Sequence, residues 1–133
     1  DVYLVSTGKK CSGTFVPCLS LSYRDYLRLL KCATIAIQMS QIREGWCRVL
    51  HEAMLCKTPV VGSGKGGMAE LLTGGGQIIC RDFRELKGYV KQLLENEELR
   101  KELGEKGYEF AKNFTYERFK REWTQLIYEI AET

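Results

Sequence analysis

The sequence predicts an α/β fold, a Rossmann-like parallel sheet with flanking helices. Two short runs, residues 34–39 and 77–80, are almost continuously apolar, which is typical of strands buried on both faces of a parallel sheet. Segments with apolar residues at helical spacing lie between such runs, as in residues 22–32. Alternating strands and helices imply right-handed crossovers and one sheet covered on both faces.

The first half of the chain alternates between the two kinds of element. Residues 2–5 form a short apolar run that Gly8 closes. Pro17, in the next candidate strand, indicates a sheet edge or a strand end. Ser22 and Asp25 have the Ser-x-x-acid spacing of a helix start. We expect strands at residues 2–5, 14–18, 34–39, 58–62 and 77–80, and helices at residues 22–32, 46–56 and 67–73.

The second half, from Asp82 onward, predicts helices only. Asn96 and Thr115 are the expected N-caps of the last two helices. Gly104 and Gly107 are expected to weaken the helix that follows Asn96, or to break it in the middle. The expected helices are residues 83–95, residues 97–112 and a last one whose apolar face comprises Phe119, Trp123, Leu126, Ile127 and Ile130.

Length and composition limit the class of protein. The 133 residues suffice for one domain, spanning residues 1–133, and the net charge of +3 gives no reason to expect a nucleic-acid partner. No signal peptide is visible and no apolar run reaches the ~20 residues of a membrane span. We therefore predict a cytoplasmic location and no transmembrane segment, with peripheral membrane contact of the parent protein left open. A strand directly after Asp1 predicts a piece of a longer protein.

The six cysteines predict no zinc site. None forms a Cys-x-x-Cys pair, and His51 is the only histidine. Several cysteines lie inside apolar runs, so we interpret them as small buried hydrophobic residues of a protein in a reducing compartment.

Two glutamates mark the candidate site. In an open parallel sheet, ligands bind at the carboxyl ends of the strands, here the loops 7–13, 40–45 and 62–67. Glu44 lies on the second loop and Glu52 on the helix that follows. Carboxylates accept hydrogen bonds from hydroxyls, and helix N-termini bind phosphate. A nucleotide diphosphate sugar would fit both features, whereas a helix-start charge and a surface residue are the plain structural alternative.

The wider motif decides between these interpretations. Ile-Arg-Glu-Gly-Trp, Val-Leu-His-Glu-Ala-Met-Leu-Cys, Thr-Pro-Val-Val and Gly-Gly-Met-Ala-Glu-Leu-Leu follow one another over residues 42–72. This order resembles the E-x7-E signature of the C-terminal, donor-binding domain of retaining GT-B glycosyltransferases, family 4 (glycosyl transferases group 1). The resemblance implies one half of a GT-B fold, lacking its first strand. It also implies a parent enzyme that transfers a sugar from a nucleotide donor without a metal or other cofactor.

The resemblance implies a role for each matching residue. Glu44 matches the catalytic-site glutamate that bonds hydroxyls of the donor sugar, and Glu52 matches the glutamate that holds the ribose hydroxyls. The remaining donor-binding positions are Gly45, Trp46, Cys47, Arg48, Val49, Gly66 and Gly67, with Glu70 as the acid after the glycine pair. No metal ligand is implied.

Several positions depart from the family pattern. Ser40-Gln41 replaces Pro-Ser. Cys47 replaces a glycine and is expected to narrow the pocket, and Lys57 replaces a glycine that would favour a left-handed turn. The family's Arg and Lys for the diphosphate and its N-terminal acceptor domain lie upstream of Asp1. We therefore expect the isolated domain to be inactive, and the acceptor (sugar, lipid or protein) stays open.

Two other functions compete with the transferase. One is a degenerate or regulatory nucleotide-binding module, for which Cys47 and Lys57 would be signs of decay. The other is an NAD-binding Rossmann domain, because residues 62–67 fit G-x-G-x-x-G after a strand, with Asp82 twenty residues on. The short helix expected after that loop, and its place late in the chain, argue against the NAD-binding domain.

Side chains near the motif are expected to have structural roles. We expect Trp46 and His51 to pack, and Lys65 to be solvated rather than bound to phosphate. Cys47 stands near a helix N-terminus, where a thiol pKa can be lowered, but no partner base is evident for a nucleophile.

Overall fold

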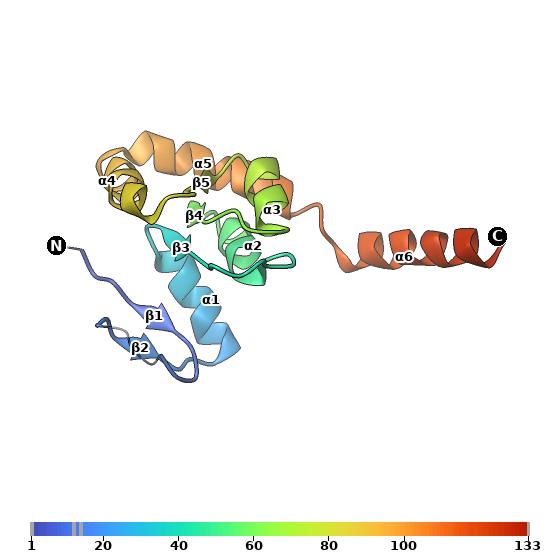
Figure 1. The fold of residues 1–133 in the computed structure, drawn as a ribbon, viewed down its shortest axis with the longest axis horizontal. Coiled ribbons are helices and arrows are strands. Elements are labelled where there is room, and N and C mark those ends of the chain that lie inside the picture. The colour runs from blue at the N-terminus through green and yellow to red at the C-terminus, as the bar shows by residue number, and fades with distance from the viewer. Residues whose placement is uncertain (1, 12, 14, 133) are drawn as a thin grey trace.

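A computed structural model of the chain, describing residues 2–11, 13 and 15–132, confirms the α/β fold (Figure 1). A three-stranded parallel sheet forms its centre, and helices cover both faces. The strands are β1 (Ser6–Thr7), β2 (Cys18–Leu19), β3 (Ala36–Gln38), β4 (Val60–Gly62) and β5 (Ile78–Ile79). The helices are α1 (Tyr23–Cys32), α2 (Arg48–Leu55), α3 (Met68–Gly74), the 3-10 turn η1 (Phe83–Glu85), α4 (Leu86–Glu95), α5 (Glu97–Ala111) and α6 (Tyr116–Ala131).

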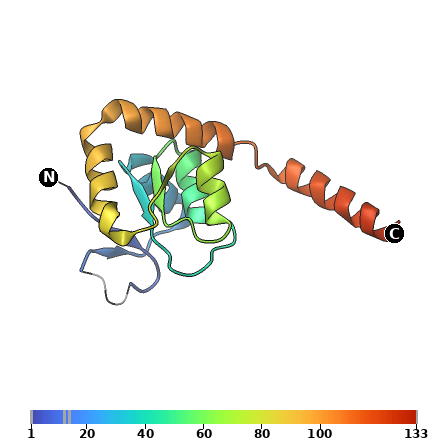
Figure 2. The same ribbon diagram turned by 45° about the horizontal axis from the view of Figure 1, so that its top comes forward.

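The central sheet has the order β3–β4–β5, with Ala36 opposite Val60 and Val61 opposite Ile78. Successive side chains of a strand point to opposite faces, and β4 shows the consequence. Val60 belongs to the core cluster under α2 and α3, whereas Val61 belongs to the cluster formed with Leu93 of α4 and Leu103 of α5. In Figure 2 the strands accordingly stand between α4 on one side and α2 and α3 on the other.

The N-terminal segment differs from the prediction. Residues 2–5 form no strand, and their side chains are exposed, Tyr3 to 89%. Strand β1 instead starts at Ser6 and pairs in parallel with β2, apart from the central sheet. Of the expected strand at residues 14–18, only Cys18 is in a strand, and Thr14 lies outside the described residues. An apolar run forms a strand only beside a neighbouring strand that accepts its hydrogen bonds, and the described residues offer none to residues 2–5.

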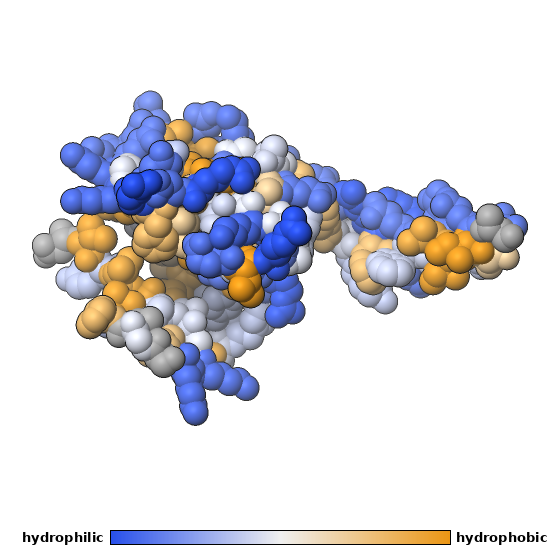
Figure 3. Space-filling model, in the orientation of Figure 1, coloured by the Kyte–Doolittle hydropathy of each residue, from blue (hydrophilic) through white to orange (hydrophobic). Residues whose placement is uncertain are grey.

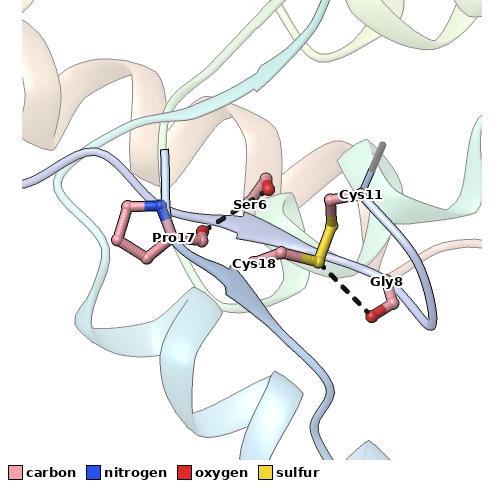
Figure 4. The surroundings of a disulfide bond; sticks show 5 residues. All are labelled: Ser6, Gly8, Cys11, Pro17 and Cys18. Carbon is pink, nitrogen blue, oxygen red and sulfur yellow. Dashed lines mark hydrogen bonds between the residues drawn. A yellow bond between two sulfur atoms is a disulfide. The ribbon is translucent and has the colours of Figure 1, made fainter. Parts of the chain in front are cut away.

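The interpretation of several cysteines as small buried residues is confirmed for two of them, whereas Cys56 is half-buried. Cys47 and Cys80 are buried, and Cys32 is exposed. Cys11 and Cys18 form a disulfide with Cα atoms 5.7 Å apart, beside the β1–β2 pairing (Figure 4). The pairing of Ser6 with Cys18 brings the two cysteines together, a long-range contact that a spacing of seven residues does not reveal.

The expected helix starts are confirmed. The side chains of three residues each accept a hydrogen bond from the backbone N–H of the residue three positions later. The residues are Ser22, Asn96 and Thr115, with distances of 3.2, 2.9 and 3.2 Å. These bonds satisfy backbone N–H groups that have no partner inside the helix. Helices α1, α5 and α6 therefore begin where the sequence placed them.

Helix α5 is continuous, so its two glycines do not break it, which was one of the two outcomes that the sequence left open. A Cβ atom on Gly104 would lie 2.4 Å from the Lys57 carbonyl oxygen, and one on Gly107 would lie 3.1 Å from the Met54 side chain. The missing side chains therefore let α5 pack directly on α2 and on the turn that follows it. This packing offsets the ~1 kcal/mol that a glycine costs in a helix.

Lys57 has the left-handed conformation that the sequence predicted, with a φ of 60°. Its ammonium group bonds Glu105 at 2.8 Å and lies 5.0 Å from the centre of the Tyr108 ring. We expect Lys57→Gly to be more stable than Lys57→Ala by about 1 kcal/mol, because a left-handed φ costs a Cβ-bearing residue about that much. Both variants lose the same side-chain contacts, so chemical denaturation of the pair measures the backbone strain alone. Equal stabilities, or a more stable alanine variant, would contradict the strain.

Helix α6 extends away from the rest of the molecule (Figures 1 and 2). The helix and its apolar face are as predicted, but the face is not covered by the described part of the chain. Phe119, Trp123 and Ile127 are each at least half exposed. Apolar side chains accordingly gather along one side of this helix in the space-filling view (Figure 3).

Candidate functional site

The loop after β3 carries Glu44 and is joined to the glycine loop after β4. The Glu44 N–H donates to the Lys65 carbonyl at 3.2 Å, and the Gly67 N–H donates to the Glu44 carbonyl at 2.9 Å. Glu44 and Gly66 form an isolated parallel bridge. The structure thus brings Glu44, Gly66 and Gly67 together at the carboxyl ends of the central strands, as the sequence predicted for the two loops.

The glycine pair is needed for this close approach. Gly66 has a φ of +69°, and a Cβ atom there would lie 2.3 Å from the Glu44 carbonyl oxygen. A Cβ atom on Gly67 would lie 1.6 Å from the Gly45 carbonyl oxygen. Both glycines therefore hold the backbone of residues 44–45 in place, and this contact fixes where the Glu44 side chain begins.

Helix α2 offers backbone donors next to Glu44. Cys47 is its N-cap, in a left-handed conformation with a φ of 61°. The N–H groups of Leu50 and His51 donate to the Cys47 carbonyl at 3.2 and 3.3 Å. Those of Arg48 and Val49 have no partner among the residues that the structure describes. Free N–H groups and the positive end of the helix dipole favour an anion here.

The Cys47 thiol does not have the lowered pKa that its position near a helix start allowed. It is buried in the core cluster with Leu50 and Met68. Burial raises its pKa, and the nearby Glu44 carboxylate raises it further. The sulfur is therefore a protonated packing group rather than a nucleophile.

Trp46 and His51 have the packing roles that we predicted. The Trp46 indole N–H donates to His51 Nδ1 at 2.8 Å, and the other His51 nitrogen lies 3.0 Å from the Ala111 carbonyl. Because an indole can only donate, the Nε2 atom of His51 carries the proton and donates to Ala111. Trp46 also lies against Phe114, with ring centres 4.8 Å apart. These contacts tie the start of α2 to the end of α5.

Glu52 lies on α2 and is half-buried as a residue. The Tyr23 hydroxyl of α1 donates to its Oε1 atom at 3.0 Å. Sequence reasoning missed Tyr23, which it treated only as part of a helix pattern. The signal that could have found it is a tyrosine at the first turn of the preceding helix, but only the packing of α1 on α2 shows which residue it meets.

A cavity of about 300 Å³ opens beside Tyr23, between the β1–β2 pair and α1. Its lining is formed by Thr7, Gly8, Lys9, Leu19, Ser20, Leu21, Tyr23 and Tyr26.

Three backbone N–H groups of the glycine loop already have a partner in the structure. The Ser63 N–H donates to the Gln38 carbonyl and the Gly67 N–H to the Glu44 carbonyl. The Gly64 N–H faces the Met68 sulfur at 3.3 Å. Helix α3 has only seven residues, as short as the sequence indicated. Such a loop positions its neighbour rather than cradling a pyrophosphate.

Lys65 is not simply solvated, since its ammonium group bonds the backbone and side chain of Gln41 at 3.2 and 2.9 Å. Within the described ranges, no group of three or more metal-binding side chains is found. None of the described helices is long and apolar enough to cross a membrane. Whether the protein uses a metal stays a prediction.

Fold and arrangement together define a Rossmann-like α/β domain, and sequence comparisons name its family. The sequence profile of the family "Glycosyl transferases group 1" matches residues 17–110. The chain therefore belongs to the group 1 glycosyltransferases.

Similar proteins carry related names. An uncharacterised glycosyltransferase of Methanocaldococcus jannaschii is 35% identical over 91 residues, covering 66% of this chain and 25% of that protein. A trehalose synthase of Rubrobacter xylanophilus is 35% identical over 96 residues, covering 71% and 23%. An N-acetyl-alpha-D-glucosaminyl L-malate synthase of Bacillus anthracis is 32% identical over 104 residues, covering 76% and 26%. The matched part of the chain thus spans about a quarter of the length of these relatives.

Proposed function

We propose that the chain is the donor-binding, C-terminal domain of a retaining GT-B glycosyltransferase of family 4. The protein that contains it would transfer a sugar from a nucleotide diphosphate sugar to an acceptor. Glu44 would bond hydroxyls of the donor sugar, and Glu52 would bond the ribose hydroxyls. The observation that carries the proposal is the position of Glu44 next to the start of α2, at the carboxyl ends of β3 and β4. No side chain caps this start of α2.

The residues of the site would contact successive parts of the donor in the order in which these residues follow one another in the chain. The free N–H groups of Arg48 and Val49 would face the diphosphate, because they are the donors at the positive end of α2. Glu44 precedes these groups in the chain, and Glu52 follows one turn along the helix. Neither carboxylate is locked into an ion pair with a described residue within 4.0 Å. Both carboxylates are therefore available as acceptors for hydroxyl groups.

Catalysis would be mainly electrostatic. Transfer of the sugar leaves a nucleoside diphosphate, and the helix N–H groups would stabilise its developing charge. Basic side chains from a part of the protein upstream of Asp1 would complete the neutralisation. We propose that no metal or cofactor takes part and that the protein acts in the cytoplasm.

The rest of the active site would come from an N-terminal acceptor domain. The uncovered apolar face of α6 and the exposed residues 2–5 support a longer protein that packs on this domain. The domain by itself would bind the donor weakly and would not turn it over.

Ligand titration followed by NMR tests the proposal. We expect UDP or GDP sugars to shift the backbone signals of residues 46–52. Shifts confined to residues 62–67 with NAD would instead indicate a dinucleotide-binding domain. If no nucleotide causes a shift in the chain or in the protein that contains it, a degenerate module without donor binding is favoured. A repeat with Glu44→Ala and Glu52→Ala checks that the shifts arise from the proposed site.

A further inference from the structure

We propose that Tyr23 is a positioning residue that holds the Glu52 carboxylate toward the ribose of the nucleotide. The inference rests on the proposed function and adds a residue from a different helix to the site. Tyr23 is the first residue of α1, and its hydroxyl donates to Glu52 Oε1 at 3.0 Å across the contact between α1 and α2.

The fold fixes the position of Tyr23 relative to Glu52. The buried Thr58 hydroxyl, two residues before β4, donates to the Leu30 carbonyl of α1 at 2.6 Å. Leu30 itself belongs to the same core cluster as Leu50 of α2. With both helices anchored on one core, the hydroxyl–carboxylate contact is set by tertiary packing and does not depend on a flexible loop.

A second tyrosine lies near the same carboxylate. Tyr26 lies one turn after Tyr23, with ring centres 6.2 Å apart. Its hydroxyl is buried and, within the described part of the chain, has no hydrogen-bond partner. Burial raises the Tyr26 pKa, and the Glu52 charge raises it further. The hydrogen bond to Glu52 is likewise the main cause of the raised Tyr23 pKa. The Tyr23 hydroxyl therefore stays protonated at neutral pH and donates to Glu52.

This arrangement leaves one side of Glu52 for a ligand. A carboxylate has two oxygens that accept hydrogen bonds. Tyr23 occupies Oε1, and Oε2 has no partner among the described side chains. The ribose hydroxyls of the ligand would bond Oε2, while Tyr23 holds the carboxylate through Oε1.

Affinity measurements with Tyr23→Phe test this role in the protein that contains the chain. The probes are UDP, GDP and ADP, each with its 2′,3′-dideoxy form, in calorimetric titrations. We expect Tyr23→Phe to weaken the best-bound ribonucleotide about five-fold, because a hydrogen bond to a charged acceptor is lost. Tyr23→Phe should not change the affinity for the dideoxy form, because that form lacks the ribose hydroxyls through which the effect acts. For the same reason, Tyr23→Phe should not lower the affinity further in a protein that already carries Glu52→Gln. Tyr116→Phe, on the exposed first turn of α6, is the matched control and should bind like the unaltered protein.

The outcomes separate the inference from the proposed function. If the unaltered protein binds none of the three nucleotides, the proposed function is overturned, and the role of Tyr23 with it. If it binds but Tyr23→Phe has the same affinity or a higher one, only the positioning role is overturned. An equal loss for the ribo and dideoxy forms would mean that Tyr23 acts on another part of the ligand, which also overturns it.

Discussion

Replacing Glu44 with glutamine is expected to lower kcat/KM about 30- to 150-fold in the protein that contains this chain. Glutamine keeps the size of the side chain but removes the charge that would bond the donor-sugar hydroxyls. A hydrogen bond to a charged group is worth about 2 to 3 kcal/mol, which corresponds to that loss. The measurement is the rate of nucleoside diphosphate release from the donor sugar that the protein turns over.

The expected loss at Glu44 is separable from a loss of folding. The backbone of Glu44, rather than its side chain, makes the bonds to Lys65 and Gly67. Glu44→Gln should therefore unfold at the same temperature as the unaltered chain. Glu117→Gln, on exposed α6, is the matched control and should retain full activity. An unchanged kcat/KM in Glu44→Gln would rule out the proposed role of this carboxylate.

Replacing Gly67 with alanine is expected to destabilise the chain by about 3 kcal/mol. The added Cβ atom would meet the Gly45 carbonyl oxygen at 1.6 Å, and because this neighbour is backbone, the two loops must separate. Overpacking of this kind costs typically ~1–3 kcal/mol and occasionally more. For a chain of this size the midpoint of thermal unfolding should fall by about 10 °C.

The matched control is Gly88→Ala on helix α4. A Cβ atom there meets nothing within 4 Å, and alanine favours a helix over glycine by about 1 kcal/mol. The two substitutions should therefore shift the unfolding temperature in opposite directions. Equal shifts would show that the close approach of Gly67 to residue 45 does not exist in solution. Hydrogen exchange at the Gly67 N–H, which donates to Glu44, should accelerate only in Gly67→Ala.

Sequence reasoning predicted most elements because their signals are local. The caps at Ser22, Asn96 and Thr115 depend on residues three positions away. Strands β3 and β5 show as apolar runs, although the structure leaves Ile78 and Ile79 of β5 half-buried rather than fully buried. The left-handed turn at Lys57 shows because a lysine stands where the family has glycine. Each of these features could be predicted without knowing what packs against it.

Wrong predictions arose where a distant contact decides. Residues 2–5 look like a strand but have no neighbouring strand among the described residues. The glycines of α5 could weaken or break a helix but permit packing on Lys57 and Met54. A helix start can lower a thiol pKa, yet at Cys47 burial raises it. In each case the local preference is worth about 1 kcal/mol, which tertiary packing exceeds.

The sequence by itself determined the α/β class, the places of the three central strands along the chain and the motif that includes Glu44, Glu52 and the glycine pair. Those features are encoded in residues close together in the chain. Only the tertiary structure decided that Gly66 and Gly67 hold the Glu44 backbone, that Cys11 joins Cys18, and that Tyr23 meets Glu52. These contacts depend on how the loops and helices come together around one core, a distance relation that no local pattern carries.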